Sequence, residues 1–407
     1  MTSAQAIDVF DPDHLDNPYP LYRLLREQAP VYQVPGTDFF LVSTGELLIE
    51  AAARTTDFSS NLTAVLVREP DGSAATFDID AGGQAVHVLA TADDPVHAAH
   101  RKLVAPVLAK RIRTLGGTVD ALVDRLWRRE VRAGHIDWAT GMADRLPLAV
   151  VADLIGLPES DRPQLLSWAY DSTEMLGGVV PAERLPQLMT SAAELAGYLH
   201  TAFAAAKAQP GAHDDNLLGV LAAGARAGQV EDHVAVLILI QLVGAGGEST
   251  AGLIANAARI LASDPELQQQ VREQPALIPA LLDETLRLES PFRGHHRHVT
   301  ADTRLGDLDL PAGSHLLLLW GAANRDPATF PDPDTLDLHR PNQRTHLAFG
   351  KGAHYCIGSA LAKLEASAAL TTLLDNTRRF TLDEDARPRW LPSLFVRRHL
   401  TLPLRID

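Results

Sequence analysis

Cysteine is nearly absent from this chain, which holds one, Cys356, among 407 residues. A single thiol excludes an internal disulfide, and it excludes a zinc or iron–sulfur site built from cysteines alone. Cys356 is therefore a reactive nucleophile, an inert buried residue, or the one protein ligand of a bound metal centre.

Positive charge is also scarce. Lys and Arg total 36 against 51 Asp and Glu, which gives a formal net charge of −15, and aromatic residues make up only 5% of the chain. This balance argues against nucleic acid as a partner, because phosphate binding needs clustered cations. The 46% of hydrophobic residues nevertheless suffices for the core of a soluble globular protein.

The chain has little that could cross a membrane. Its most apolar run, 234–247, is interrupted by Gln241 and is too short to span a bilayer. The first residues carry neither the basic segment nor the apolar stretch of a signal peptide. We therefore expect a cytoplasmic protein without a membrane anchor.

The spacing of the apolar residues predicts a mainly α protein with small β-sheets, an α+β fold. Helical periodicity dominates from about 95 to 290 and is broken at glycines and prolines. Residues 31–42 predict a β-hairpin, and the pattern turns to strands after Pro291. Residues 61–91 hold several glycines among apolar residues, and we expect a long loop there.

The cysteine lies in the string Phe-Gly-Lys-Gly-Ala-His-Tyr-Cys-Ile-Gly at 349–358. Gly350 and Gly352 permit backbone angles and close approach that a side chain would block, so the loop can lie flat against a large planar ligand such as haem. Strong helix formers follow from Ala360 onward. Because a helix start stabilises a thiolate, this position predicts a lowered pKa for Cys356.

The fixed spacing Phe-Gly-x-Gly-x-His-x-Cys-x-Gly resembles the haem-binding loop of the cytochromes P450, the haem-thiolate monooxygenases. The resemblance implies haem b as cofactor, with Cys356 as axial ligand of its iron and with Phe349, Gly350 and His354 in contact with it. It also implies the family's fold over the whole chain, 1–407, as a single domain. That domain would have a helix-rich core at about 95–290, β-rich parts at about 31–60 and 291–320, a long central oxygen-binding helix over the haem, and the haem-binding loop at 349–358.

Three glycines, at 244, 246 and 247, lie inside the helical pattern 235–261. In a helix interior each glycine costs roughly 1 kcal/mol relative to alanine, so a compensating reason is expected. Close packing against a neighbouring helix is one explanation. A groove beside the haem, wide enough for dioxygen and a water, is the other.

The same segment resembles the family's oxygen-binding stretch, which makes Glu248 the acid and Ser249 the alcohol of a proton relay. The commonest form of this stretch has threonine at the alcohol position. Serine keeps the donor but loses the β-methyl that restricts the rotamer, so we expect looser coupling and more peroxide release. Thr250 is the rival candidate for the working hydroxyl.

Glu284 and Arg287 form a Glu-x-x-Arg pattern on a predicted helix. Alone, such a pair is common on solvated helix faces. Beside the cysteine loop it resembles the family's buried Glu-Arg pair, with Arg340 as the candidate third member. The resemblance implies a structural role, because removing one partner of a buried pair strands the other charge.

Haem carries two propionates that need cations. His97 and Arg101 are four residues apart on one predicted helix face, and they resemble the family's His-x-x-x-Arg pair. Arg297 and His354 match two further propionate contacts of the family. Arginine suits this task because its planar fork binds carboxylates bidentately.

Arg297 lies within a run of histidines at 295, 296 and 298. Successive side chains of a strand point to opposite faces, so these three histidines cannot converge on one metal ion. His295 shares the face of Arg297, and we expect it near the haem edge or the substrate, with His296 and His298 as packing or surface residues. By resemblance to the family, the substrate contacts expected are Phe77, Leu242, Ala245, Phe292, His295 and Phe395.

Five basic residues form a possible docking patch for an acidic ferredoxin: Lys102, Arg111, Arg113, Arg344 and Lys351. The alternative is that they are ordinary solvated side chains.

The resemblance implies a monomeric monooxygenase that inserts one oxygen atom from O2 into a mainly apolar small molecule. Its electrons would come from NAD(P)H through a ferredoxin reductase and a ferredoxin. A peroxide-driven peroxygenase, a non-catalytic haem-binding or sensor protein, and an enzyme whose substrate is carrier-bound are the alternatives.

Overall fold

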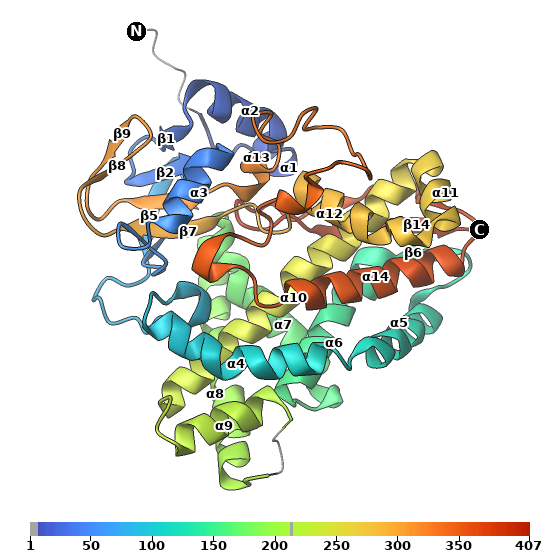
Figure 1. Ribbon diagram of the computed structural model, residues 1–407, viewed down its shortest axis with the longest axis horizontal. Coiled ribbons are helices and arrows are strands. Elements are labelled where there is room, and N and C mark those ends of the chain that lie inside the picture. Colours follow the sequence, from blue (N-terminus) through green and yellow to red (C-terminus); the bar gives the residue numbers. More distant parts are fainter. Residues whose placement is uncertain (1–6, 212–214) are drawn as a thin grey trace.

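The computed structural model describes residues 7–211 and 215–407, and it confirms a mainly helical fold with small β-sheets (Figure 1). The helices of the described residues are α1 (Pro12–Asp16), α2 (Tyr19–Gln28), α3 (Gly45–Ala53), α4 (Val96–Ile112), α5 (Gly116–Glu130), α6 (Arg145–Ile155), α7 (Arg162–Glu174), α8 (Leu185–Ala208), α9 (Leu217–Arg226), α10 (Asp232–Ser263), α11 (Pro265–Glu273), α12 (Ile278–Leu288), α13 (Trp320–Ala323) and α14 (Ser359–Asp375). Short 3₁₀ turns join several of them, among them η1 (Leu89–Thr91).

The main sheet brings together the two ends of the chain. Its strand order is β1 (Val31–Gln33), β2 (Phe39–Val42), β10 (His315–Leu318), β7 (His295–Val299) and β3 (Phe58–Ser59). β10 runs parallel to β2 and antiparallel to β7. In Figure 1 the blue and orange strands of this region therefore lie side by side, apart from the main body of helices.

The remaining strands form small antiparallel units. They are the three-stranded sheet of β11 (Phe380–Leu382), β14 (Pro403–Ile406) and β6 (His135–Asp137), and the pairs β4 (Ala64–Arg68) with β5 (Ala74–Asp78), β8 (Thr303–Leu305) with β9 (Leu308–Leu310), and β12 (Arg389–Trp390) with β13 (His399–Thr401).

The expectation of a long loop over 61–91 is wrong for its first half. β4 and β5 pair antiparallel there, with Val65 opposite Phe77. The turn between them contains Pro70 and Asp71 followed by Gly72 at φ +91°, a conformation that glycine adopts without strain. The apolar residues of β4 were thus strand residues, and the irregular part begins only after β5.

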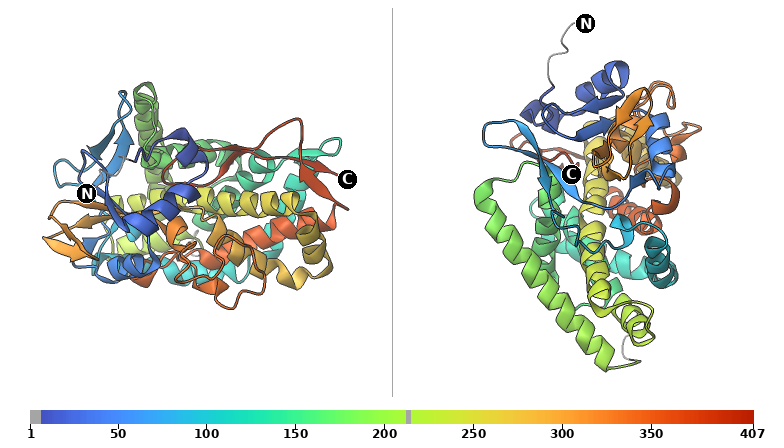
Figure 2. Two further views of the ribbon diagram at one scale, coloured as in Figure 1. Left: turned by 90° about the horizontal axis from the view of Figure 1, so that it is seen from above. Right: turned by 90° about the vertical axis from the view of Figure 1, so that its left-hand side faces the viewer.

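Helix α10 is the central element of the fold. It spans 32 residues and contacts α6, α7, α8, α9, α12 and α14 (Figures 1 and 2). By length and composition it could cross a membrane, but 19 of its residues are buried inside the protein, Glu248 among them. These packing contacts identify α10 as the core helix of a globular fold rather than a membrane anchor.

Candidate functional site

A cavity of about 1360 Å³, including its mouth, lies between α10, the start of α4, strand β7 and the cysteine loop. That volume includes space open to solvent. The cavity brings residues of the cysteine loop and of α10 to the wall of one space. The residues of the cysteine loop on its wall are Phe349, Gly350, Lys351, His354, Tyr355, Cys356, Ile357 and Gly358.

The backbone of the loop presents the thiol to this cavity. Gly350 and Gly352 have φ of +71° and +72°, which a side chain would disfavour. The N–H of Cys356 donates to the carbonyl oxygen of Phe349 at 2.9 Å, which closes the loop, and α14 begins three residues later at Ser359.

The electrostatics of the thiol differ from expectation. Burial raises the pKa of Cys356 above its ordinary value. The N–H groups of Gly358 and Ser359 and the charge of Arg101 lower the pKa by less than burial raises it. The helix start thus acts in the expected direction, but the prediction of a lowered thiol pKa in the protein alone is wrong because desolvation is the larger effect.

A rim of nitrogen donors surrounds the cysteine wall and consists of His97, Arg101, Arg297 and His354, all of which line the cavity. Arg297 is 6% exposed, and burial lowers its pKa to about 10. Within the described part of the chain it pairs with no carboxylate, and its Nη1 donates to the carbonyl of His296 at 2.7 Å. A buried guanidinium left without a counter-ion is costly, so this position calls for an anion.

The other members of the rim are held in place by neighbours. Arg101 donates to the carbonyl of Tyr355 at 2.9 Å. The rings of His97 and His354 lie 4.0 Å apart between centroids, and the Nδ1 atom of His354 is buried without a partner among the described residues. The rim therefore holds unsatisfied donors and charge beside a thiol.

This donor set fits the haem that the resemblance implies. Haem needs one axial ligand, which the sulfur of Cys356 can supply, and cations for two propionates. Arg297, His354, His97 and Arg101 would hold the propionates, and the glycine backbone at Gly350 leaves room for a flat ring.

One face of α10 forms the opposite wall, through residues that recur every three to four positions: Gln241, Leu242, Ala245, Gly246, Ser249, Thr250 and Leu253. The hydroxyl of Ser249 donates to the carbonyl of Ala245 at 3.2 Å, one turn earlier. Both candidate hydroxyls, Ser249 and Thr250, thus face the cavity, whereas Glu248 is not part of its lining.

Glu248 is instead held on the side of α10 away from the cavity. Its Oε1 accepts from Nε of Arg398 at 2.7 Å, and its Oε2 accepts from the hydroxyl of Thr173. The guanidinium of Arg398 lies 4.1 Å from the ring centre of Tyr170, whose hydroxyl donates to Asp144 at 2.5 Å. Burial raises the pKa of Asp144 to about 6, so this network combines two buried carboxyls with one arginine.

Close packing accounts for two of the three glycines of α10. A Cβ at Gly246 would lie 2.3 Å from Cγ2 of Val151 on α6, and a Cβ at Gly244 would lie 2.8 Å from Oγ of Ser172 on α7. The helix itself is α-helical without interruption over its whole length. The contacts therefore favour close helix packing, and they do not call for a groove in the helix at these two positions.

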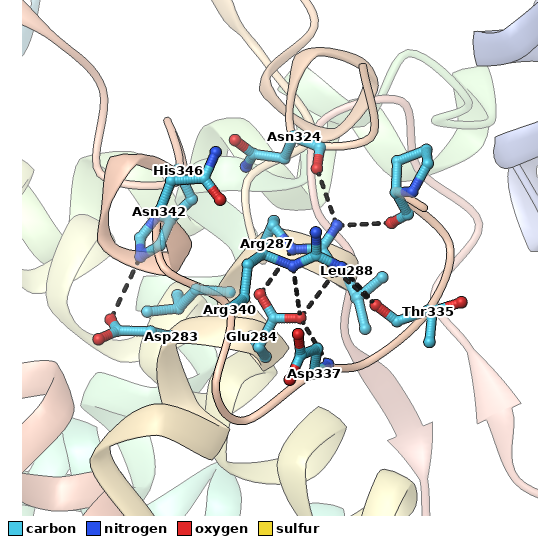
Figure 3. A network of polar contacts seen from close by, with 12 residues as sticks. Asp283, Glu284, Arg287, Leu288, Asn324, Thr335, Asp337, Arg340, Asn342 and His346 are labelled. Carbon is cyan, nitrogen blue, oxygen red and sulfur yellow. Dashed lines mark hydrogen bonds and ion pairs between the residues drawn. The ribbon is translucent and has the colours of Figure 1, made fainter. Parts of the chain in front are cut away.

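Glu284, Arg287 and Arg340 meet in a buried cluster (Figure 3). Nε and Nη2 of Arg287 donate to the two oxygens of Glu284 at 2.7 and 2.8 Å, and Nε of Arg340 donates to Glu284 at 3.3 Å. Both arginines also donate to the carbonyl of Thr335 at 2.9 Å. The cluster thus fastens α12 to the irregular segment that precedes the cysteine loop.

Four of the six expected substrate contacts line the cavity: Leu242, Ala245, Phe292 and His295. Phe77 does not, because it lies on the β4–β5 hairpin with 42% of its surface exposed. Phe395 does not either. It is buried behind Phe292, with ring centres 4.8 Å apart, and acts as packing for the wall. These two residues outside the lining belong to segments whose path the sequence pattern does not define.

The histidine run divides as strand alternation predicts. His295 and Arg297 line the cavity, whereas His296 packs on Phe395 and His298 lies beside His315. Nε1 of Trp320 donates to Nδ1 of His295 at 2.7 Å. In the described part of the chain, no cluster of three His, Cys, Asp or Glu side chains could hold a metal ion.

Several wall residues were not predicted individually from the sequence: Leu89, Ala90, Gln241, Leu253, Pro291, Trp320 and Leu361. Leu89 and Ala90 belong to η1, inside the segment expected to be a loop. Gln241 was noticed only as an interruption of an apolar run, and an amide within such a run was the available signal.

The five residues of the suggested docking patch do not behave alike. Arg111 pairs with Asp153 at 2.9 Å and with Asp215 at 3.5 Å, which reduces its free charge. Arg344 is 82% exposed and lies 3.8 Å from Asp283. Lys102, Arg113 and Lys351 are exposed.

Comparisons with known proteins agree with this site. A family model described as Cytochrome P450 matches residues 204–401. Cytochrome P450 144 of Mycobacterium tuberculosis is 46% identical over 399 residues, which cover 98% of this chain and 91% of that protein. Cytochrome P450 107B1 of Saccharopolyspora erythraea is 32% identical over 419 residues, which cover 100% of this chain and 99% of that protein.

Solved structures show the same relationship. Cytochrome P450 CREJ in complex with (4-ethylphenyl) dihydrogen phosphate superposes with a TM-score of 0.88 at 28% identity, covering 100% of this chain and 99% of that chain. CYP109E1 from Bacillus megaterium in complex with testosterone superposes with a TM-score of 0.85 at 26% identity, covering 98% and 100%. With this similarity along nearly its whole length, the chain belongs to the cytochrome P450 family, whose members are monooxygenases that bind haem b through a cysteine thiolate.

Proposed function

We propose that this P450 inserts one oxygen atom from O2 into a mainly apolar small organic molecule, with electrons from NAD(P)H delivered through a ferredoxin reductase and a ferredoxin. The cavity is the main support for this proposal, because the apolar residues Leu242, Ala245 and Phe292 line the same space as Cys356. Testosterone and (4-ethylphenyl) dihydrogen phosphate in related structures are small molecules with apolar rings, which supports this substrate class.

The cofactor contacts in this proposal follow the rim. Cys356 would ligate the haem iron, and Arg297, Arg101, His97 and His354 would bind the propionates. Phe349 and Gly350 would pack beside the ring. When bound, the haem supplies the oxygen activation, and the protein orients the substrate and excludes water. Glu284, Arg287 and Arg340 keep the segment before the cysteine loop in place.

The supply of protons to the cavity depends on residues of α10. Ser249 offers a hydroxyl at the cavity wall, with Thr250 next to it, and Glu248 is the buried acid that recharges the hydroxyl. The ion pair with Arg398 holds Glu248 away from the cavity. Proton transfer toward Ser249 therefore requires Arg398 to release the carboxylate.

The retained acid and alcohol disfavour a peroxide-driven peroxygenase, which needs no such relay, and they disfavour a sensor that performs no turnover. We also infer that the enzyme works outside the membrane as a monomer. Its exposed cations Lys102, Arg113, Arg344 and Lys351 would meet an acidic ferredoxin.

The test starts from purified haem-loaded protein. The reduced, carbon-monoxide-treated enzyme should absorb at the position diagnostic of a cysteine thiolate ligand. NADH consumption with ferredoxin and its reductase should then rise when an apolar substrate is added, and an oxygenated product should appear. Product formed with added peroxide but never with NADH would instead identify a peroxygenase. A thiolate spectrum with no product from either oxidant would favour the sensor.

Replacing Lys351 or Arg113 by Glu should slow reduction by the ferredoxin in a salt-dependent manner.

A further inference from the structure

Gln241 is a polar residue in an otherwise apolar part of the cavity wall. It lies on the cavity face of α10, next to Leu242 and one turn before Ala245, and Leu89 and Ala90 line the cavity beside it. Its side chain is half-buried, and an amide that a ligand shields from water costs about 1–3 kcal/mol unless hydrogen bonds compensate it. A ligand that covers Gln241 must therefore offer a partner to any polar atom that the protein leaves free.

One of the two polar atoms of this amide has a partner in the protein. Oε1 of Gln241 accepts from the backbone N–H of Ala90 at 2.9 Å, which ties η1 to the central helix. A backbone N–H is only a donor, so this bond fixes which end of the amide is oxygen. The NH2 group must then be the end left for other contacts.

The NH2 group of Gln241 has no acceptor among residues 7–211 and 215–407. The other polar groups near it are engaged. The hydroxyl of Ser249 donates to Ala245, and His295 is bound by Trp320 and lies toward Arg297 and His354. The charged residues of the wall belong to the cysteine side. The amide of Gln241 is thus a neutral donor on a residue that lines the cavity.

We propose that Gln241 determines specificity by donating a hydrogen bond from its NH2 group to a neutral oxygen acceptor of the substrate, such as a carbonyl. The inference rests on the proposed function for the presence of a substrate in this cavity. It narrows the substrate class to apolar molecules that carry an oxygen acceptor. A pure hydrocarbon would leave the amide unpaired, and this difference is the basis of discrimination.

The experiment compares two probes that differ by one oxygen, 1-tetralone and tetralin, by calorimetric titration of the haem-loaded protein at pH 8. We expect the wild type to bind the ketone about three- to tenfold more tightly than the hydrocarbon, as one neutral hydrogen bond allows. Gln241→Met removes both polar atoms and should abolish this preference. Gln241→Glu keeps the acceptor for Ala90 but removes the donor, and it should abolish the preference as well.

Gln269→Met serves as the matched control, because Gln269 is exposed on α11 and its amide bonds only to Glu273 at 2.7 Å. It should keep the wild-type preference. Equal affinity of the wild type for the two probes would overturn the proposal. A preference for the ketone that persists in Gln241→Glu would also overturn it, because the preference would then depend on the hydrogen bond to Ala90 rather than on the NH2 group. Binding is measured without turnover, so failure here with intact NADH-driven oxidation refutes only this inference.

Discussion

The buried cluster around Glu284 makes a prediction about burial and ion-pair strength, because the chain contains a second arginine–carboxylate pair with the same Nε–O distance. Nε of Arg287 lies 2.7 Å from Glu284, and both side chains have 0% of their surface exposed. Nε of Arg304 lies 2.7 Å from Asp309, with the two side chains 63% and 79% exposed. Distance is therefore held constant between the two sites while burial differs.

The perturbation is Arg287→Met, which keeps an unbranched side chain of similar length and removes the charge. Glu284 then keeps the 3.3 Å contact with Arg340 and the 3.0 Å bond from the backbone N–H of Asp337. The carbonyls of Asn324, Pro333 and Thr335 each lose a donor. Breaking one partner out of a buried pair costs about 3–5 kcal/mol. Since whole domains are stable by about 5–15 kcal/mol, this one change should remove a large part of the free energy of unfolding.

The assay is urea denaturation of each variant followed by far-ultraviolet circular dichroism, with the haem-to-protein ratio measured after purification. Arg287→Met should show a much lower denaturation midpoint and should lose haem. Arg304→Met should match the wild type within error, because water screens an exposed pair. The reasoning is refuted if the two variants lose the same stability, since burial would then not be the deciding factor.

Three further changes test other parts of the structure. Glu365 is 1% exposed, its Oε2 has no partner among the described residues, and burial raises its pKa well above the ordinary value of 4.5. Above pH 4.5 the unfolded chain therefore releases a proton that the folded chain keeps. Stability should therefore fall by about 1.4 kcal/mol per pH unit above this value until the folded group titrates, and urea midpoints at pH 5 and 8 should show that Glu365→Gln removes the decline. Gly246→Ala should destabilise by roughly 1–3 kcal/mol through its clash with Val151, whereas Gly197→Ala, with nothing within 4 Å, should stabilise slightly; equal midpoints would contradict the packing explanation. Ser249→Thr should lower the peroxide released per NADH consumed, because the added β-methyl restricts the hydroxyl, and an unchanged ratio would count against this role.

Local patterns in the chain were enough to predict the parts of the site that are close in sequence. The glycines and Cys356 of the loop, the pair of Glu284 with Arg287, and the alternation that separates His295 from His296 all depend on spacing along one element. Helix and strand periods are properties of consecutive residues, so they can be read without knowing the fold.

Tertiary packing decided the rest. The chain order gives no sign that Arg398, near the C-terminus, binds Glu248 in the middle of α10, or that Val151 of α6 occupies the space that makes Gly246 necessary. Phe77 and Phe395 lie outside the cavity lining for the same reason, because the path of a turn or hairpin relative to the cavity depends on distant contacts. The pKa of Cys356 likewise depends on the folded structure. Desolvation comes from all the atoms that surround the thiol, and not only from its neighbours in the sequence. The sequence by itself thus determined which chemistry the chain carries, and the packing of distant segments determined where each group points and how strongly it is charged.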